Sequence, residues 1–103
     1  MDELSVLNER FGLHDQLTFS EGPGGLAVVE ISNSLAAATV ALQGAHLLSW
    51  NPRGEQPVIW LSRDARFKVG QSIRGGVPVC WPWFGAHATQ PTFPTHSFMR
   101  TIP

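Results

Sequence analysis

The feature that most constrains the fold is a series of short apolar runs separated by turn-forming residues. Runs of this length that are rich in small and β-branched residues are typical of strands. We expect five strands, near Leu17–Ser20, Leu26–Ile31, Ala37–Leu42, His46–Trp50 and Val58–Leu61. Between the last two, the order Asn-Pro-Arg-Gly is that of a β-turn. The pattern predicts an all-β fold of antiparallel strands and hairpins, and one hairpin joins the last two runs.

The segments on either side of these runs have other patterns. Residues 4–11 carry apolar side chains at i, i+3 and i+7 after two acidic residues, which permits a short amphipathic helix or an irregular segment. After Gly70 the chain is rich in Gly and Pro up to Pro103. Since no repeat or polar linker interrupts it, we expect residues 1–103 to be part of one domain without an internal boundary.

Composition narrows the class of protein. Only 15% of the 103 residues are charged, against 43% that are hydrophobic, and this is well below the usual share of charge. A chain this size forms one modest core. About five strands leave sheet edges unpaired, and the chain stops directly after a motif typical of ordered structure. We therefore expect an incomplete β-sandwich, truncated at Pro103, whose free edges could pair between copies.

Charge and cysteine content exclude several function classes. Seven Lys and Arg against eight Asp and Glu give a net charge of −1, so no basic field attracts nucleic acid or an anionic membrane. The single cysteine, Cys80, excludes an internal disulfide and a metal site with several thiolate ligands. No apolar segment has the length of a membrane span or the flanks of a signal peptide. We expect a cytoplasmic protein with no metal and no cofactor.

The first candidate site is the sequence Arg74-Gly75-Gly76. Two glycines expose backbone N–H groups and let a ligand approach closely, and the guanidinium offers a rigid fork for a phosphate or carboxylate. The alternative is a tight turn whose arginine is only solvated. An Arg-Gly-Gly sequence alone does not decide between the two.

The second candidate is the aromatic segment Val79–Gly85, which contains Trp81, Trp83 and Phe84. Flat apolar rings held by a proline can stack on the C–H faces of a sugar, although for any one ring a place in the core is the more common role. Trp50 and Trp60, on expected strands, are predicted to be core residues.

Histidines and a second arginine complete the candidates. His87 and His96 lie near the aromatic segment and could bind a hydroxyl or transfer a proton. We expect His46 to be structural and His14 to lie in a surface loop, and the histidine spacing does not fit a zinc site. Arg100 follows His96 by four positions and could hold a phosphate together with an arginine from another loop. These residues do not complete a nucleophile elbow, a paired-acid site or a nucleotide-binding loop.

Together these motifs resemble the glucose-6-phosphate 1-epimerase family, the D-hexose-6-phosphate mutarotases, which are relatives of the galactose mutarotases. The resemblance extends from about Leu7 onward, and its specific part is Ile73–Gly85. The matching motifs, in order, are Gly44-Ala45-His46, Trp50-Asn51-Pro52, Ile73–Pro78, Trp81–Gly85 and His96–Arg100.

The resemblance implies a galactose-mutarotase-like β-sandwich and a parent enzyme, longer than this chain, that interconverts the α and β anomers of hexose 6-phosphates. It implies a catalytic histidine and glutamate further downstream, so no residue here is assigned a catalytic role. The residues that it assigns to substrate binding are Arg74, Arg100, His96, Gly75, Gly76 and Phe84.

The chain departs from the family pattern around its second arginine. Ser97 and Met99 replace small Gly and Ala residues, and Thr95 stands where a glutamine is often found. Two other hypotheses remain beside that of an enzyme part. One is a non-catalytic carbohydrate-binding β-domain, and the other is a fragment that self-associates through its sheet edges.

Overall fold

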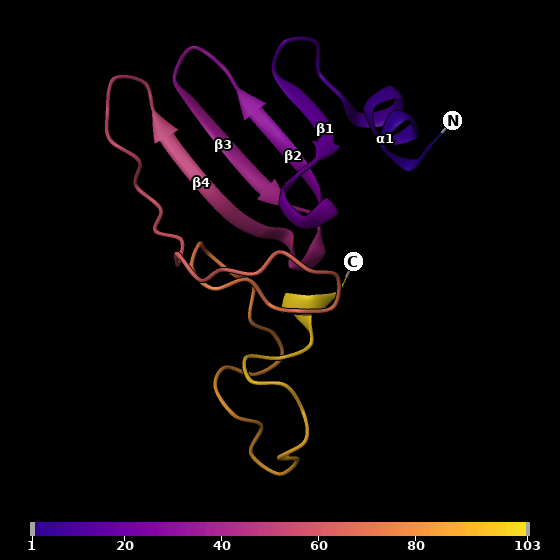
Figure 1. Ribbon diagram of the computed structural model, residues 1–103, viewed down its shortest axis with the longest axis vertical. Helices are drawn as coiled ribbons and strands as arrows, with labels where there is room; N and C mark the ends of the chain where they lie inside the picture. Colours follow the sequence, from indigo (N-terminus) through magenta and orange to yellow (C-terminus); the bar gives the residue numbers. More distant parts are fainter. Residues whose placement is uncertain (1, 103) are drawn as a thin grey trace.

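The computed structural model describes residues 2–102 and contains a four-stranded sheet in the order β1-β2-β3-β4 (Figure 1). Each pair of neighbouring strands is antiparallel, so the sheet is a simple meander. This confirms the predicted all-β class and the first four predicted strands. The strands are β1 (Leu17–Glu21), β2 (Ala27–Ser32), β3 (Ala36–Ala41) and β4 (His46–Pro52).

A helix precedes the sheet, which settles the choice left open for residues 4–11. This helix, α1, spans Glu3–Phe11, and Asp2 caps it by accepting a hydrogen bond from Ser5 N at 2.7 Å. This bond holds the pKa of Asp2 below its ordinary value. Asn8 then reaches the outer edge of β1, where its side-chain amide donates to Phe19 O and accepts from Phe19 N, both at 2.7 Å. The helix therefore occupies part of one sheet edge.

The core lies on one face of the sheet and is covered by the chain that follows β4. Val28 and Ala41 are partners across β2 and β3 and are both buried. Leu26, Leu48 and Ile73 complete the buried cluster, and the partly buried Leu61, Ala65 and Phe67 pack against it. The loop from 61 to 73 thus covers the end of the sheet where β4 begins, and it delivers the residues that follow Ile73 to that end.

The predicted fifth strand is wrong. Residues 58–61 form no strand, and the expected hairpin is reduced to one hydrogen bond, from Val58 N to Trp50 O at 3.1 Å. The edge of β4 pairs instead with Val77, which exchanges two backbone hydrogen bonds with Leu47 at 2.9 and 3.1 Å. Trp50 and Trp60 are also not core residues, since they are 42% and 71% exposed.

The rest of the chain is irregular and extends away from the sheet, as the orange and yellow part of Figure 1 shows. It returns to the base of the sheet at η3 (Met99–Thr101), beside η2 (Gln43–Ala45). Gly44 N donates to Ile102 O at 2.7 Å, and Gly44 has a φ of +71°. A side chain on Gly44 would meet Arg100 O at 2.7 Å, so this return requires glycine.

Candidate functional site

The Arg74-Gly75-Gly76 turn is held from two sides by backbone segments. On one side Ser62 N donates to Arg74 O at 3.1 Å, and Gly76 N donates to Trp60 O at 2.6 Å. On the other side the turn continues into Val77, which pairs with the start of β4. The backbone from which the Arg74 side chain projects is therefore fixed between β4 and the 60–62 segment.

The two glycines are required by this packing. Gly75 has a φ of +97°, and a Cβ there would lie 2.6 Å from Leu61 Cα. Gly76 has a φ of +68°, and a Cβ there would lie 2.8 Å from His46 Nε2. Both values are far inside ordinary contact distance, and both backbone conformations are unfavourable for other residues. Close approach of the protein's own chain thus explains the glycines, and their contact with substrate stays a prediction.

His46 lies under this turn and is structural, as predicted. Its side chain is 1% exposed, and its Nε2 lies 2.6 Å from Gly75 O. Gln43, also buried, holds the neighbouring loop: its side chain donates to Gln71 O at 2.9 Å and accepts from Gly70 N at 2.8 Å. These two polar side chains connect the base of the sheet to the loops that carry the candidate site.

Arg74 itself is exposed and lines a hollow of about 360 Å³. The other lining residues are Asp64, Arg66, Gln71 and Ser72. Two guanidinium groups face one carboxylate here, and arginine keeps its charge at any physiological pH. The hollow therefore carries a net positive charge suited to an anion. Arg66 was not among the site residues predicted from the sequence.

The aromatic segment divides into a packed part and an exposed part. Trp83 stacks on Phe93 with ring centroids 5.8 Å apart and meets Phe98 edge-on at 5.1 Å. His87 packs edge-on against Trp83 at 4.7 Å. Phe84, in contrast, is 79% exposed and tilts over the ring of His96 at 4.4 Å. Trp81 is 68% exposed as well, so Phe84 and Trp81 are the rings of the segment with the most free surface for a ligand.

His96 and Arg100 are held by the chain around them. His96 Nδ1 accepts from Gly85 N at 2.8 Å, and His96 N donates to Gly85 O at 2.8 Å. Arg100 Nη1 donates to Thr95 O at 3.5 Å. Arg100 Nε is buried and has no hydrogen-bond partner within residues 2–102. The structure thus brings His96 and Phe84 together, whereas the hollow beside Arg74 is not lined by Arg100.

Ser97 occupies the position where the family resemblance implies glycine. Its φ is +78°, in the left-handed region that favours glycine, and its side chain is buried. The hydroxyl oxygen accepts from Trp81 N at 2.8 Å and from Met99 N at 3.2 Å. The serine therefore keeps the backbone conformation of a glycine and ties the aromatic segment to the Arg100 motif.

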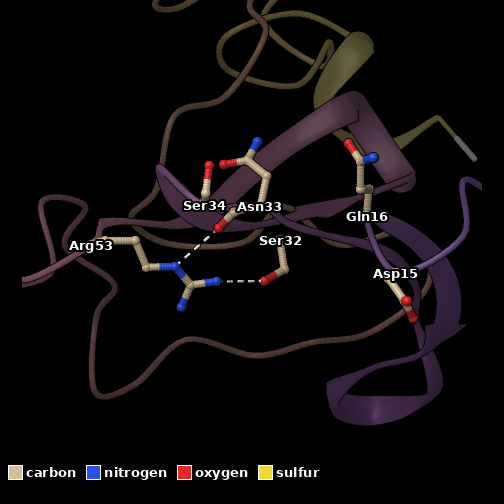
Figure 2. Close-up of a pocket in the computed structure, with 6 residues that line it drawn as sticks. All are labelled: Asp15, Gln16, Ser32, Asn33, Ser34 and Arg53. Atoms are coloured by element: carbon tan, nitrogen blue, oxygen red, sulfur yellow. Dashed lines mark hydrogen bonds between the residues drawn. The ribbon is translucent and has the colours of Figure 1, made fainter.

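A larger hollow, about 470 Å³, lies at the opposite end of the sheet. Figure 2 shows the six residues that line it. Its arginine, Arg53, is already engaged: Nη2 donates to Ser32 Oγ at 2.7 Å, and Nε donates to Asn33 O at 3.1 Å. These bonds tie the turn after β4 to the turn between β2 and β3. We therefore assign this hollow a structural origin and place the candidate site at Arg74.

Two kinds of feature are absent from the described residues, a metal-binding cluster and a membrane-spanning helix. Within residues 2–102, no three His, Cys, Asp or Glu side chains are grouped so that they could hold a metal ion. Over the same residues, no helix has the length and apolar character needed to cross a membrane.

Comparison with known proteins gives a consistent result. The model of the aldose 1-epimerase family matches residues 27–102. The chain is 54% identical over 78 residues to an Escherichia coli (strain K12) protein named "Putative glucose-6-phosphate 1-epimerase", and 51% identical over 78 residues to the protein of the same name from Salmonella typhimurium. Each alignment covers 76% of this chain and 26% of the relative, so the chain spans about a quarter of the length of these relatives.

Solved structures agree with this assignment. A crystal structure described as a "putative mutarotase (YeaD)" from Salmonella typhimurium superposes with a TM-score of 0.81 at 42% identity, over 95% of this chain and 35% of that one. The crystal structure of HI1317 superposes with a TM-score of 0.75 at 37% identity, over 87% of this chain and 32% of that one. The sheet is thus part of a mutarotase-like fold, and the chain belongs to the aldose 1-epimerase family.

Proposed function

We propose that this chain is the N-terminal, substrate-binding part of a hexose-6-phosphate mutarotase, in which residues 1–103 belong to one larger domain. The observation that carries the proposal is the exposed Arg74 guanidinium, which projects from a clamped turn into a positively charged hollow. The names of the relatives support the substrate class, a glucose 6-phosphate or related sugar.

The reaction needs two proton transfers. A base removes the proton of the anomeric hydroxyl while an acid protonates the ring oxygen, so that the ring opens, C1 rotates, and the ring closes on its other face. We assign neither step to residues 1–103 and place the required histidine and glutamate in the part of the relatives that this chain does not span. The fragment alone is then expected to be inactive and to need no cofactor.

The residues of this chain bind and orient the substrate in this proposal. Arg74, with Gly75 and Gly76 behind it, takes the phosphate, because a guanidinium can donate two parallel hydrogen bonds to phosphate oxygens. Arg100 lies outside the Arg74 hollow and supplies a second contact to the substrate, through the guanidinium N–H groups that are not bonded to Thr95 O. His96 and Phe84 form the wall against the sugar ring, where Phe84 presents its exposed face.

The test is binding of glucose 6-phosphate to the full 103-residue chain, measured by NMR titration beside unphosphorylated glucose. A hydrogen bond to a charged group contributes about 1.5–3 kcal/mol, which corresponds to roughly a 10- to 100-fold change in affinity. Arg74→Ala should therefore weaken the binding of glucose 6-phosphate by about that factor and leave the binding of glucose unchanged. Arg63→Ala, which removes an exposed arginine outside the hollow, is the matched control. Equal loss for both sugars would remove phosphate recognition from Arg74.

A second candidate function is carbohydrate binding without catalysis. The exposed Phe84 ring beside His96 favours it, because this wall can hold a sugar without any proton-transfer pair. Saturation-transfer NMR of anomer exchange in glucose 6-phosphate tests the catalytic side. We expect no acceleration by the chain alone, and clear acceleration would contradict both binding without catalysis and the inactivity of the fragment.

The location and the assembly stay predictions. A cytoplasmic location is supported by the single thiol. Asn8 bonds to the edge of β1, and Val77 pairs with the edge of β4. Self-association through these edges would have to use the remaining backbone groups of the two strands. Sedimentation as a clean monomer at high concentration would contradict it.

A further inference from the structure

A buried imidazole sits directly beneath the candidate phosphate-binding turn. His46 is 1% exposed and its Nε2 lies 2.6 Å from Gly75 O. A carbonyl oxygen can only accept a hydrogen bond, so Nε2 carries a proton and is the donor in this contact. Nδ1 is also buried and has no partner among the described residues. Burying an unpaired polar atom is costly, and an apolar side chain would fill this space without that cost.

The turn is shaped around this ring. A Cβ on Gly76 would lie 2.8 Å from His46 Nε2 and 2.9 Å from its Cδ2, so the ring occupies the space that the missing side chain leaves. The next residue, Leu47, exchanges two backbone hydrogen bonds with Val77. Two consecutive residues at the start of β4 therefore hold Gly75 and Val77, the residues on either side of Gly76.

This contact acts on two glycines, whose backbone has few restraints of its own. Gly75 and Gly76 have φ values of +97° and +68°, and glycine has the widest conformational range of any residue. Arg74 directly precedes Gly75, so a change in the φ and ψ of Gly75 changes how Arg74 is placed relative to β4. The bond from His46 Nε2 to Gly75 O is the side-chain restraint on this peptide from the β4 side.

We infer that His46 is a positioning residue, which fixes the Gly75 carbonyl and so aims Arg74 into its hollow. The effect of His46 on phosphate binding rests on the proposed function, whereas its hold on the Gly75 carbonyl does not. It assigns to His46 a donor role at one atom, Nε2. A glutamine places its amide nitrogen near the position of a histidine Nε2, whereas asparagine is one carbon shorter and phenylalanine has no donor.

The experiment compares His46→Gln, His46→Asn and His46→Phe in the full chain. Amide hydrogen exchange, read by NMR, reports on the turn through Ser62 N, which donates to Arg74 O, and Gly76 N, which donates to Trp60 O. We expect these two amides to exchange at least tenfold faster in the Asn and Phe variants and to stay near the wild-type rate in the Gln variant. The amide of Phe19, which donates to Asn8 Oδ1 at the β1 edge on the far side of the sheet from β4, is the control and should not change.

Titration with glucose 6-phosphate supplies the functional readout. The Asn and Phe variants should lose affinity for glucose 6-phosphate and keep their affinity for glucose. The Gln variant should bind glucose 6-phosphate with an affinity near that of the wild type. If the Phe variant does not fold, the Asn and Gln pair carries the comparison. Equal behaviour of Gln and Asn, or faster exchange spread evenly over the sheet, would overturn the inference.

Failure of the proposed function gives a different pattern. If Arg74→Ala does not change phosphate affinity while the Gln and Asn variants still differ at Ser62 and Gly76, then the phosphate role of Arg74 is wrong and the hold of His46 on the turn stands. If Arg74→Ala acts as expected and His46→Phe leaves both amides protected, the inference about His46 is wrong and the proposed function stands.

Discussion

Substitution of Gly76 by alanine tests whether the candidate turn is fixed by close packing against β4. The added Cβ would overlap Leu47 O and would lie 2.8 Å from His46 Nε2. The left-handed backbone costs a residue with a side chain about 1–2 kcal/mol. Forcing extra volume into a packed site costs about 1–3 kcal/mol more. We expect Gly76→Ala to lower the free energy of unfolding by about 2–5 kcal/mol.

Gly54 provides a matched control. It also has a left-handed φ, +79°, but a Cβ there would meet nothing within 4 Å. The effect of alanine on the unfolded chain is the same at both positions and cancels in the comparison. Gly54→Ala should therefore cost only the backbone part, about 1–2 kcal/mol. The difference between the two variants measures the overlap with β4 alone.

Urea unfolding followed by tryptophan fluorescence measures both variants, because the midpoint reports stability when the slope is unchanged. The free energy of unfolding of a domain is about 5–15 kcal/mol in total, so Gly76→Ala would remove a large part of it. Equal midpoints for the two variants would refute the reasoning, since they would show that the turn moves away from His46 and Leu47 at no cost.

Two other predictions follow from side-chain contacts. Ser97→Ala removes two accepted hydrogen bonds and should cost about 2 kcal/mol, at about 1 kcal/mol each. Ser97→Gly loses the same bonds but relieves the left-handed backbone, so it should be about 1 kcal/mol more stable than Ser97→Ala in urea; the reverse order would contradict the strain. At the start of α1, the Ser5 N–H lowers the pKa of Asp2 below its ordinary 3.8. The cap is therefore fully present above pH 3.8 and is lost as the pH falls through the lower folded value. The Ser5 amide signal should titrate with a midpoint below 3.8, and a midpoint at or above 3.8 would refute the capping bond.

The first four strands could be predicted from the sequence because their limits are local. Glycine, proline and asparagine mark the turns, and apolar residues between them alternate or cluster as strands require. The fifth strand could not be predicted, because its place was decided by a distant residue. Val77 pairs with Leu47 at the edge of β4, and the run 58–61 is left to contact the Arg74–Gly76 turn instead. Local sequence contains no sign of that competition.

The candidate site was predictable only in part. Arg74 stands out because two glycines follow it, and a double glycine marks an unusual backbone. The reason for the glycines was not predictable, since it lies in the approach to Leu61 and His46 from elsewhere in the chain. Arg66 was missed for a similar reason. It lines the hollow because of the path of its loop, and that loop is held by hydrogen bonds from Gln43, a residue distant in the sequence.

The two halves of the proposed binding surface are held in different ways. Arg74 is fixed to the sheet, through His46 and the pairing of Leu47 with Val77. His96 is bonded to Gly85 within its own loop. The loop is tied to the sheet where Ile102 O accepts from Gly44 N, close to Arg100. The Ser97 hydroxyl accepts from Trp81 N and Met99 N, which both lie outside the sheet. These bonds stabilise the loop internally and do not join it to the sheet. The proposed phosphate contact is therefore built on the sheet, whereas the proposed sugar wall depends on the loop keeping its own shape.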